Sequence, residues 1–218
     1  MGFTGFPAEA VTFYEGLGAD NSRAYWQANK DVYSRSVRGP MDSLVEELAE
    51  FGPFHIFRPH RDVRFAKDKT PYKDHVAAYG EGEGGTGYYV HFSATGMFAG
   101  SGYYHMAADQ LERFRSAVDD DVAGSRIESI VASLTQQGMR ATAMNELKTA
   151  PRGYPKDHPR IELLRMKGLI TWKQWPVAAW LGTAKAKERI VDVLHAAKPI
   201  NAWLDKQVGP TTMSMERR

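Results

Sequence analysis

The sequence contains no cysteine. This absence excludes disulfides, thiolate-bound metals, iron–sulfur clusters and cysteine nucleophiles, and it is typical of proteins from a reducing compartment. No apolar run reaches the roughly 18 residues that a membrane-spanning helix needs. The first residues also lack the basic and apolar regions of a signal peptide. We therefore expect a cytoplasmic protein with no membrane partner.

An excess of charge of either sign is also missing, because 28 Lys and Arg residues stand against 26 Asp and Glu residues. So small a net charge says little about partners. A chain of 218 residues, 43% of them hydrophobic, is long enough to bury a sizeable core. We expect one domain over residues 1–210 and a frayed tail over residues 211–218.

Helical spacing dominates residues 1–50, which carry eight acidic and four basic residues. The pattern predicts a helix that begins at Asp20 or Asn21 and runs to about Val37. Gly39-Pro40 then predicts the restart of a second helix, because proline suits the first helical position.

Strand alternation and glycine-marked turns replace this pattern in residues 54–106. Their short connections favour antiparallel pairing, because such connections cannot cross over. One strand is expected at Asp62–Ala66, with Val63 and Phe65 on the face opposite Arg64. Glycines 80, 82 and 85 satisfy G-x-G-x-x-G but lead into a strand, which predicts a hairpin loop rather than a dinucleotide site.

Helical periodicity returns after residue 106, and the expected elements are helices near 111–118 and 127–134, a short helix from Pro159, a strand at 169–175 and a helix from Thr183 interrupted at Pro199. Helices, then consecutive strands, then helices again predict an α+β fold. We expect a single domain in which a mainly antiparallel central sheet is packed by N-terminal and C-terminal helices.

Basic residues concentrate in residues 55–75, where six Lys and Arg stand against three Asp. Arginine offers a planar fork and lysine a mobile point charge to a phosphate or carboxylate. The competing interpretation is a solvated edge whose Asp residues pair with these cations. We predict no metal site, since pairing of Asp62, Asp68 and Asp74 with neighbouring cations is commoner than Mg²⁺ binding.

A second basic stretch surrounds Arg152 in the turn-rich segment 151–155. If this stretch folds against residues 61–73, the two would form one positive cleft that focuses field on an anion. The sequence leaves their convergence open.

The run Arg61-Asp62-Val63-Arg64-Phe65-Ala66-Lys67-Asp68-Lys69-Thr70-Pro71-Tyr72-Lys73, with Gly87-Tyr88-Tyr89 and Pro151-Arg152-Gly153-Tyr154, resembles a family of conserved hypothetical proteins known as domain of unknown function 2461. Asp20-Asn21-Ser22-Arg23-Ala24-Tyr25-Trp26 is similar to the amino-terminal helix of that family, although Asp20 replaces an Asn and Gln27 replaces a Phe. The resemblance spans nearly the whole chain. It implies importance for the charged residues and Tyr72 of the central run, and it implies no reaction.

We therefore predict a protein that binds a phosphorylated or carboxylated small molecule. The predicted ligand-binding residues are Arg61, Arg64, Lys67, Lys69, Tyr72, Lys73 and Arg152. If chemistry occurs there, Asp68 or His75 is the expected proton carrier. The alternative is a nucleic-acid-binding or protein-interaction module that uses the same basic surface. Enzymatic activity, cofactor and oligomeric state stay open.

Overall fold

The computed structural model describes residues 2–64 and 67–213. The chain folds as two compact units. The first comprises Met1–Gly80, Tyr89–Ala99 and Gln174–Asp192, and the second comprises Glu81–Tyr88, Gly100–Lys173 and Val193–Arg218.

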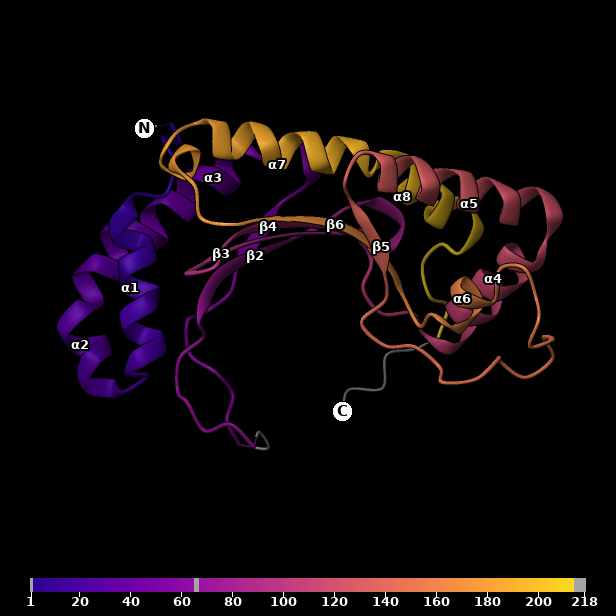
Figure 1. Ribbon diagram of the computed structural model, residues 1–218, viewed down its shortest axis with the longest axis horizontal. Helices are drawn as coiled ribbons and strands as arrows, with labels where there is room; N and C mark the ends of the chain where they lie inside the picture. The colour runs from indigo at the N-terminus through magenta and orange to yellow at the C-terminus, as the bar shows by residue number, and fades with distance from the viewer. Residues whose placement is uncertain (1, 65–66, 214–218) are drawn as a thin grey trace. The chain divides into compact units, whose positions relative to one another are not determined.

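The strands form one six-stranded sheet (Figure 1). They are β1 (Phe54–Ile56), β2 (His75–Glu81), β3 (Gly87–Ser93), β4 (Gly96–Tyr103), β5 (Arg140–Thr142) and β6 (Leu169–Trp175). Their order is β1-β2-β3-β4-β6-β5, with β1 antiparallel to β2 and β5 antiparallel to β6. The predicted α+β class with a mainly antiparallel central sheet is confirmed.

Helices of the first unit come from the N-terminal region and from one C-terminal segment. They are α1 (Ala8–Ala19), α2 (Arg23–Val32), η1 (Tyr33–Arg38), α3 (Gly39–Glu47), η2 (Ala49–Phe51), η4 (Ala179–Gly182) and most of α7 (Lys185–Ala196). Ser22 begins α2, because its hydroxyl accepts a hydrogen bond from the Tyr25 N–H at 3.1 Å. Aromatic rings fill this core, and Phe6 stacks on Phe92 with centroids 4.3 Å apart.

The predicted second helix does begin at Gly39, as α3 with Pro40 in its first turn, but no break in helical structure precedes it. Helical structure continues from α2 through the π-helix η1 into α3. The Gly39 N–H donates to the Ser34 carbonyl, five residues back. A proline ring would clash with the carbonyl four residues before it, and the wider π turn accommodates Pro40 without ending the helix.

Helices of the second unit are α4 (Ala108–Asp119), α5 (Asp121–Gln136), α6 (Ile161–Arg165), α8 (Lys198–Gln207) and the short η3 (Glu83–Gly85), which joins β2 to β3 in the predicted hairpin loop. Asp120 separates α4 from α5, since its carboxylate accepts from the N–H groups of Val122 and Ala123 at 3.0 and 2.7 Å. Phe114 packs edge-on against Trp203, with centroids 6.1 Å apart.

None of the helices in the described part of the chain has both the length and the apolar character needed to cross a bilayer.

Of the predicted tail, residues 214–218 lie outside the described residues. Thr211 donates to Asp109 Oδ1 at 2.7 Å. The prediction of one domain over residues 1–210 stays a prediction.

Candidate functional site

Residues 58–74 form a long connection between β1 and β2, which we call the basic loop. Its two arms are antiparallel, because the Arg61 N–H donates to the Pro71 carbonyl and the Lys73 N–H donates to the Pro59 carbonyl, both at 2.8 Å. These backbone bonds hold the two arms of the loop side by side.

Tyr72 anchors the basic loop to α2. Its ring is 4% exposed and stacks on Trp26, with centroids 4.4 Å apart and 8° between the planes. The Asn21 side chain accepts from the Tyr72 N–H at 3.1 Å and donates to the Tyr72 carbonyl at 3.0 Å. A β-bridge pairs Tyr72 with His60. The predicted ligand-binding residue Tyr72 therefore lies beneath the loop, in the core.

The tip of the basic loop departs from the predicted strand. Residues 62–64 are not in a strand, and Phe65 and Ala66 lie outside the described residues. Arg64 donates to Asp62 through Nε at 2.9 Å and Nη2 at 2.6 Å, and its N–H donates to the same carboxylate at 3.3 Å. These bonds hold the pKa of Asp62 at about 2. Such local side-chain to backbone bonding competes with strand geometry, which explains the wrong prediction.

The Asp68 carboxylate interacts with both Arg61 and Thr70. It accepts from the N–H and hydroxyl of Thr70, both at 2.9 Å, and it is ion-paired with Arg61. The bonds from Thr70, followed by the charge of Arg61, lower the pKa of Asp68. Lys69 donates to the Val63 carbonyl at 2.9 Å. Much of the positive charge at the tip is thus engaged within the loop.

Three cations of the loop stand outside these pairs. Arg58, Lys67 and Lys73 have no ion pair with any side chain that the structure describes. Lys73 Nζ lies over the Phe57 ring, 5.0 Å from its centroid. Burial, and then the charges of Arg58 and Arg61, lower the pKa of Lys73. The charged groups that most affect Lys73 are therefore positive, and they repel its ammonium.

Asp74 links this cationic region to an imidazole. Its Oδ1 lies 2.8 Å from His75 Nδ1 and 3.7 Å from Arg61 Nη2. Burial raises the pKa of Asp74, but the hydrogen bond and charge of His75, together with the charge of Arg61, outweigh it, so this pKa lies below its usual value. An ionised carboxylate can only accept, so Nδ1 of His75 is the donor in this contact.

His91 lies beside this pair. Its ring centroid is 5.3 Å from that of His75, and its ring also stacks on Phe98 with centroids 5.0 Å apart. Burial, and then the charge of His75, lower the pKa of His91 to about 4. His91 is therefore neutral at pH 7 and adds no positive charge beside His75.

Replacing His91 with phenylalanine is expected to flatten the dependence of stability on pH. The folded pKa is about 4 against an ordinary value of 6.5, so between these values the unfolded state binds more protons and stability falls as the pH is lowered. The wild type should lose about 2–3 kcal/mol across this window through His91. Urea denaturation at pH 7.5, 6, 5 and 4 measures the difference. The control is His105→Gln, at an exposed site. The prediction would be refuted if the free energy of unfolding depended on pH equally in the wild type, in His91→Phe and in His105→Gln.

The second basic stretch lies in the other compact unit. Arg152 is exposed and follows Pro151 into a turn at Gly153, whose φ is 92°. The convergence of Arg152 with the basic loop stays a prediction.

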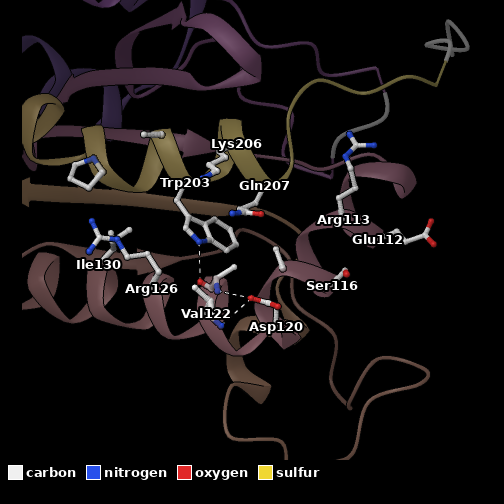
Figure 2. Close-up of a pocket in the computed structure, with 14 residues that line it drawn as sticks. Glu112, Arg113, Ser116, Asp120, Val122, Arg126, Ile130, Trp203, Lys206 and Gln207 are labelled. Atoms are coloured by element: carbon white, nitrogen blue, oxygen red, sulfur yellow. Dashed lines mark hydrogen bonds between the residues drawn. The ribbon is translucent and has the colours of Figure 1, made fainter.

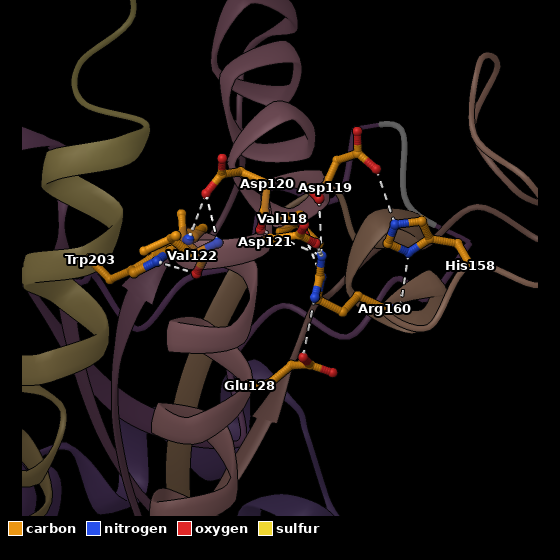
Figure 3. A network of polar contacts seen from close by, with 10 residues as sticks. Val118, Asp119, Asp120, Asp121, Val122, Glu128, His158, Arg160 and Trp203 are labelled. Carbon is orange, nitrogen blue, oxygen red and sulfur yellow. Dashed lines mark hydrogen bonds and ion pairs between the residues drawn. The ribbon is translucent and has the colours of Figure 1, made fainter.

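Arg160, in the same stretch, is used inside the second unit (Figure 3). Its side chain is 8% exposed and donates through Nε to the Val118 carbonyl at 2.6 Å and through Nη2 to the Asp119 carbonyl at 3.0 Å. Arg160 Nη1 lies 3.6 Å from Glu128 Oε2. His158 contacts the Asp119 carboxylate at 3.0 Å and its Nδ1 accepts from the Arg160 N–H at 3.0 Å. The Arg160 guanidinium and the His158 ring are therefore engaged at the end of α4.

A groove of about 960 Å³ lies on the second unit between α4, α5 and α8 (Figure 2). Its lining combines apolar and charged residues: Glu112, Arg113, Ser116, Ala117, Asp120, Val122, Ala123, Arg126, Ile130, Pro199, Ala202, Trp203, Lys206 and Gln207. It contains no predicted site residue. In the sequence, apolar residues at helical spacing predicted core packing here. This pattern gave no signal for a groove formed by small residues on three helices.

Two features of the basic loop also escaped prediction. Arg58 and Asp74 were seen in the sequence as members of the charged run, but neither was assigned to the site. Asp74 stands between Lys73 and His75 in the sequence, which was a usable signal. Arg58 is brought near Lys73 only by the pairing of the loop arms, so it gave no such signal. Across the described residues, no group of three or more His, Asp or Glu side chains is placed to hold a metal ion.

A family model described as a conserved hypothetical protein (DUF2461) matches residues 9–203, which include the basic loop, the Arg160 network and most of the groove. None of the curated proteins searched matches the chain.

Proposed function

The chain belongs to this family of conserved hypothetical proteins, and for its basic loop we propose the binding of an anionic small molecule that carries a phosphate or carboxylate. Arg58, Lys73 and Arg61 supply the main proposed donors. Lys67, Lys69 and Arg64 contribute positive charge at the tip, and Arg152 remains a proposed donor from the second unit.

The observation that carries this proposal is the charge environment of Lys73. Its ammonium lies over the Phe57 ring and has no carboxylate partner among the described side chains. Burial, and then the charges of Arg58 and Arg61, disfavour the charged form of this side chain and lower its pKa. A bound anion would relieve this repulsion and accept charge-assisted hydrogen bonds. The competing interpretation, a fully paired surface, accounts for Arg64 and Asp62 but not for Lys73.

His75 is the proposed proton carrier at this site. Asp74 orients the His75 imidazole through Nδ1, which leaves Nε2 as the proposed base. The same Asp74 carboxylate lies near Arg61, so the imidazole is close to the proposed anion donors. Asp68 suits this role less well, because its hydrogen bonds lower its pKa and favour the ionised form.

Titration with inorganic phosphate tests the donors. Lys73→Met and Arg58→Ala are each expected to weaken phosphate binding about tenfold, which corresponds to about 1.4 kcal/mol. Lys73→Arg should retain most of the affinity because it keeps the charge. Arg64→Ala should weaken binding less than about threefold, since Asp62 already compensates this guanidinium. ³¹P NMR line broadening and thermal shift give the affinities.

Equal phosphate affinity in wild type, Lys73→Met and Arg58→Ala would contradict the proposal, and so would the absence of stabilisation by phosphate and by a panel of organic acids. Under the alternative, the same variants lose affinity for a single-stranded oligonucleotide, with binding that falls steeply as salt rises.

A further inference from the structure

Small side chains on three helices create the groove of the second unit. Ala117 on α4, Ala123 on α5 and Ala202 on α8 leave space above Trp203. The Trp203 side chain is fixed because its Nε1–H donates to the Ala123 carbonyl at 3.0 Å. Figure 2 shows its indole between the α5 wall and the α8 wall. The hollow therefore has a rigid aromatic floor.

The dimensions of the groove suit a short helix. Its α5 wall runs from Val122 to Ile130 and its α8 wall from Pro199 to Gln207, so each wall is about 12 Å long at 1.5 Å per residue. Two turns of an α-helix are about 11 Å long and 10–12 Å across, and they fill about 1,000 Å³. The groove volume of about 960 Å³ is close to this value.

Exposed residues on both walls show that the groove opens to solvent. Val122, one of the lining residues, is 82% exposed. Arg126 on α5 and Lys206 on α8 are exposed and have no ion pair with any described side chain.

Neither acidic residue of the lining, Glu112 or Asp120, forms an ion pair with these two cations. The Asp120 carboxylate is bound to the N–H groups that begin α5. Glu112 lies beside Ser116, away from Arg126 in Figure 2. The groove thus joins an apolar floor to uncompensated positive charge on opposite walls, which complements an apolar surface flanked by carboxylates.

We propose that this groove docks two turns of an amphipathic helix from a partner protein, with its apolar side chains over Trp203 and its acidic side chains beside Arg126 and Lys206. Helix-in-groove recognition uses apolar anchors spaced i, i+3 or i+4, and i+7. This site lies on the second unit and does not depend on the proposed function of the basic loop.

Selection of a randomised helical peptide library on the full chain tests the proposal. Enriched peptides are expected to carry apolar anchors at that spacing, flanked by Asp or Glu. Fluorescence anisotropy of an enriched peptide should show that Ala202→Trp, which fills the groove from an exposed position, abolishes binding. Arg126→Glu should weaken binding about tenfold, because it places a negative charge beside the acidic flank.

Lys198→Glu is the matched control, because Lys198 is exposed on α8 but does not line the groove. It should leave the affinity within about twofold, and unchanged thermal unfolding should show that each variant is folded. Failure to enrich this pattern, or equal binding by wild type and Ala202→Trp, would overturn the proposal. A concentration-dependent dimer in sedimentation that Ala202→Trp abolishes would also overturn it, because a second copy would then be the occupant.

Discussion

Arg160→Met is expected to lower the free energy of unfolding by about 3–5 kcal/mol. The buried guanidinium satisfies the carbonyls of Val118 and Asp119 where α4 ends, and it faces Glu128. Methionine fills similar space but leaves these carbonyls without their donor, and each unsatisfied buried group costs about 1–3 kcal/mol. Urea or guanidinium denaturation at pH 7 measures the loss.

The close packing around Arg160 explains why a smaller perturbation should also be costly. A Cβ on Gly124 would lie 2.5 Å from Arg160 Nε and 2.3 Å from the Val118 carbonyl oxygen. Glycine at this position in α5 therefore permits the guanidinium to reach the end of α4, and Gly124→Ala should displace it.

Arg126→Met is the control for Arg160→Met, because Arg126 is an exposed arginine on α5. Its replacement should change the free energy of unfolding by less than about 0.5 kcal/mol. Arg160→Lys keeps the charge but not the planar fork, so it should fall between the two. Equal stability of Arg160→Met and Arg126→Met would show that the network contributes little.

Tyr72→Ala is expected to cost about 3–5 kcal/mol, as large aromatic truncations in a core do. It removes the ring stacked on Trp26 and leaves a cavity where the basic loop meets α2. The loop arms should also become accessible, because the bridge between His60 and Tyr72 loses its buried side chain. Denaturation measures the stability, and limited proteolysis reports cleavage within residues 58–74.

Tyr72→Phe separates stacking from the hydroxyl. Phenylalanine keeps the ring against Trp26, so the loss should stay below about 1 kcal/mol and proteolysis should match the wild type. A phenylalanine variant as unstable as Tyr72→Ala would show that the hydroxyl, rather than the stack, anchors the loop. Phosphate binding in Tyr72→Phe should be retained, because the donors of the basic loop keep their positions.

Local pattern predicted much of the element order. The strand at 169–175 and the helices that end near Gly138 and break near Pro199 follow from spacing, glycine and proline. The three-residue strand β5 escaped prediction, because it is defined by pairing with β6 about 30 residues later. The π-helix before Pro40 escaped because a proline usually signals a helix start.

For the candidate site, the sequence alone determined which residues carry charge and that they are concentrated in residues 55–75. It also carried the resemblance to the family that the chain belongs to. Adjacent residues suffice for such inferences, because periodicity and composition are local properties.

Only the tertiary structure decided how those charges are used. It pairs Arg64 with Asp62, leaves Lys73 beside other cations, and joins Asp74 to His75 and Arg61. It also buries Arg160 against carbonyls about 40 residues away and brings Trp203 to Ala123. Burial and ion pairing depend on the distances between side chains in the folded chain, and those distances are set by long-range packing rather than by sequence neighbours.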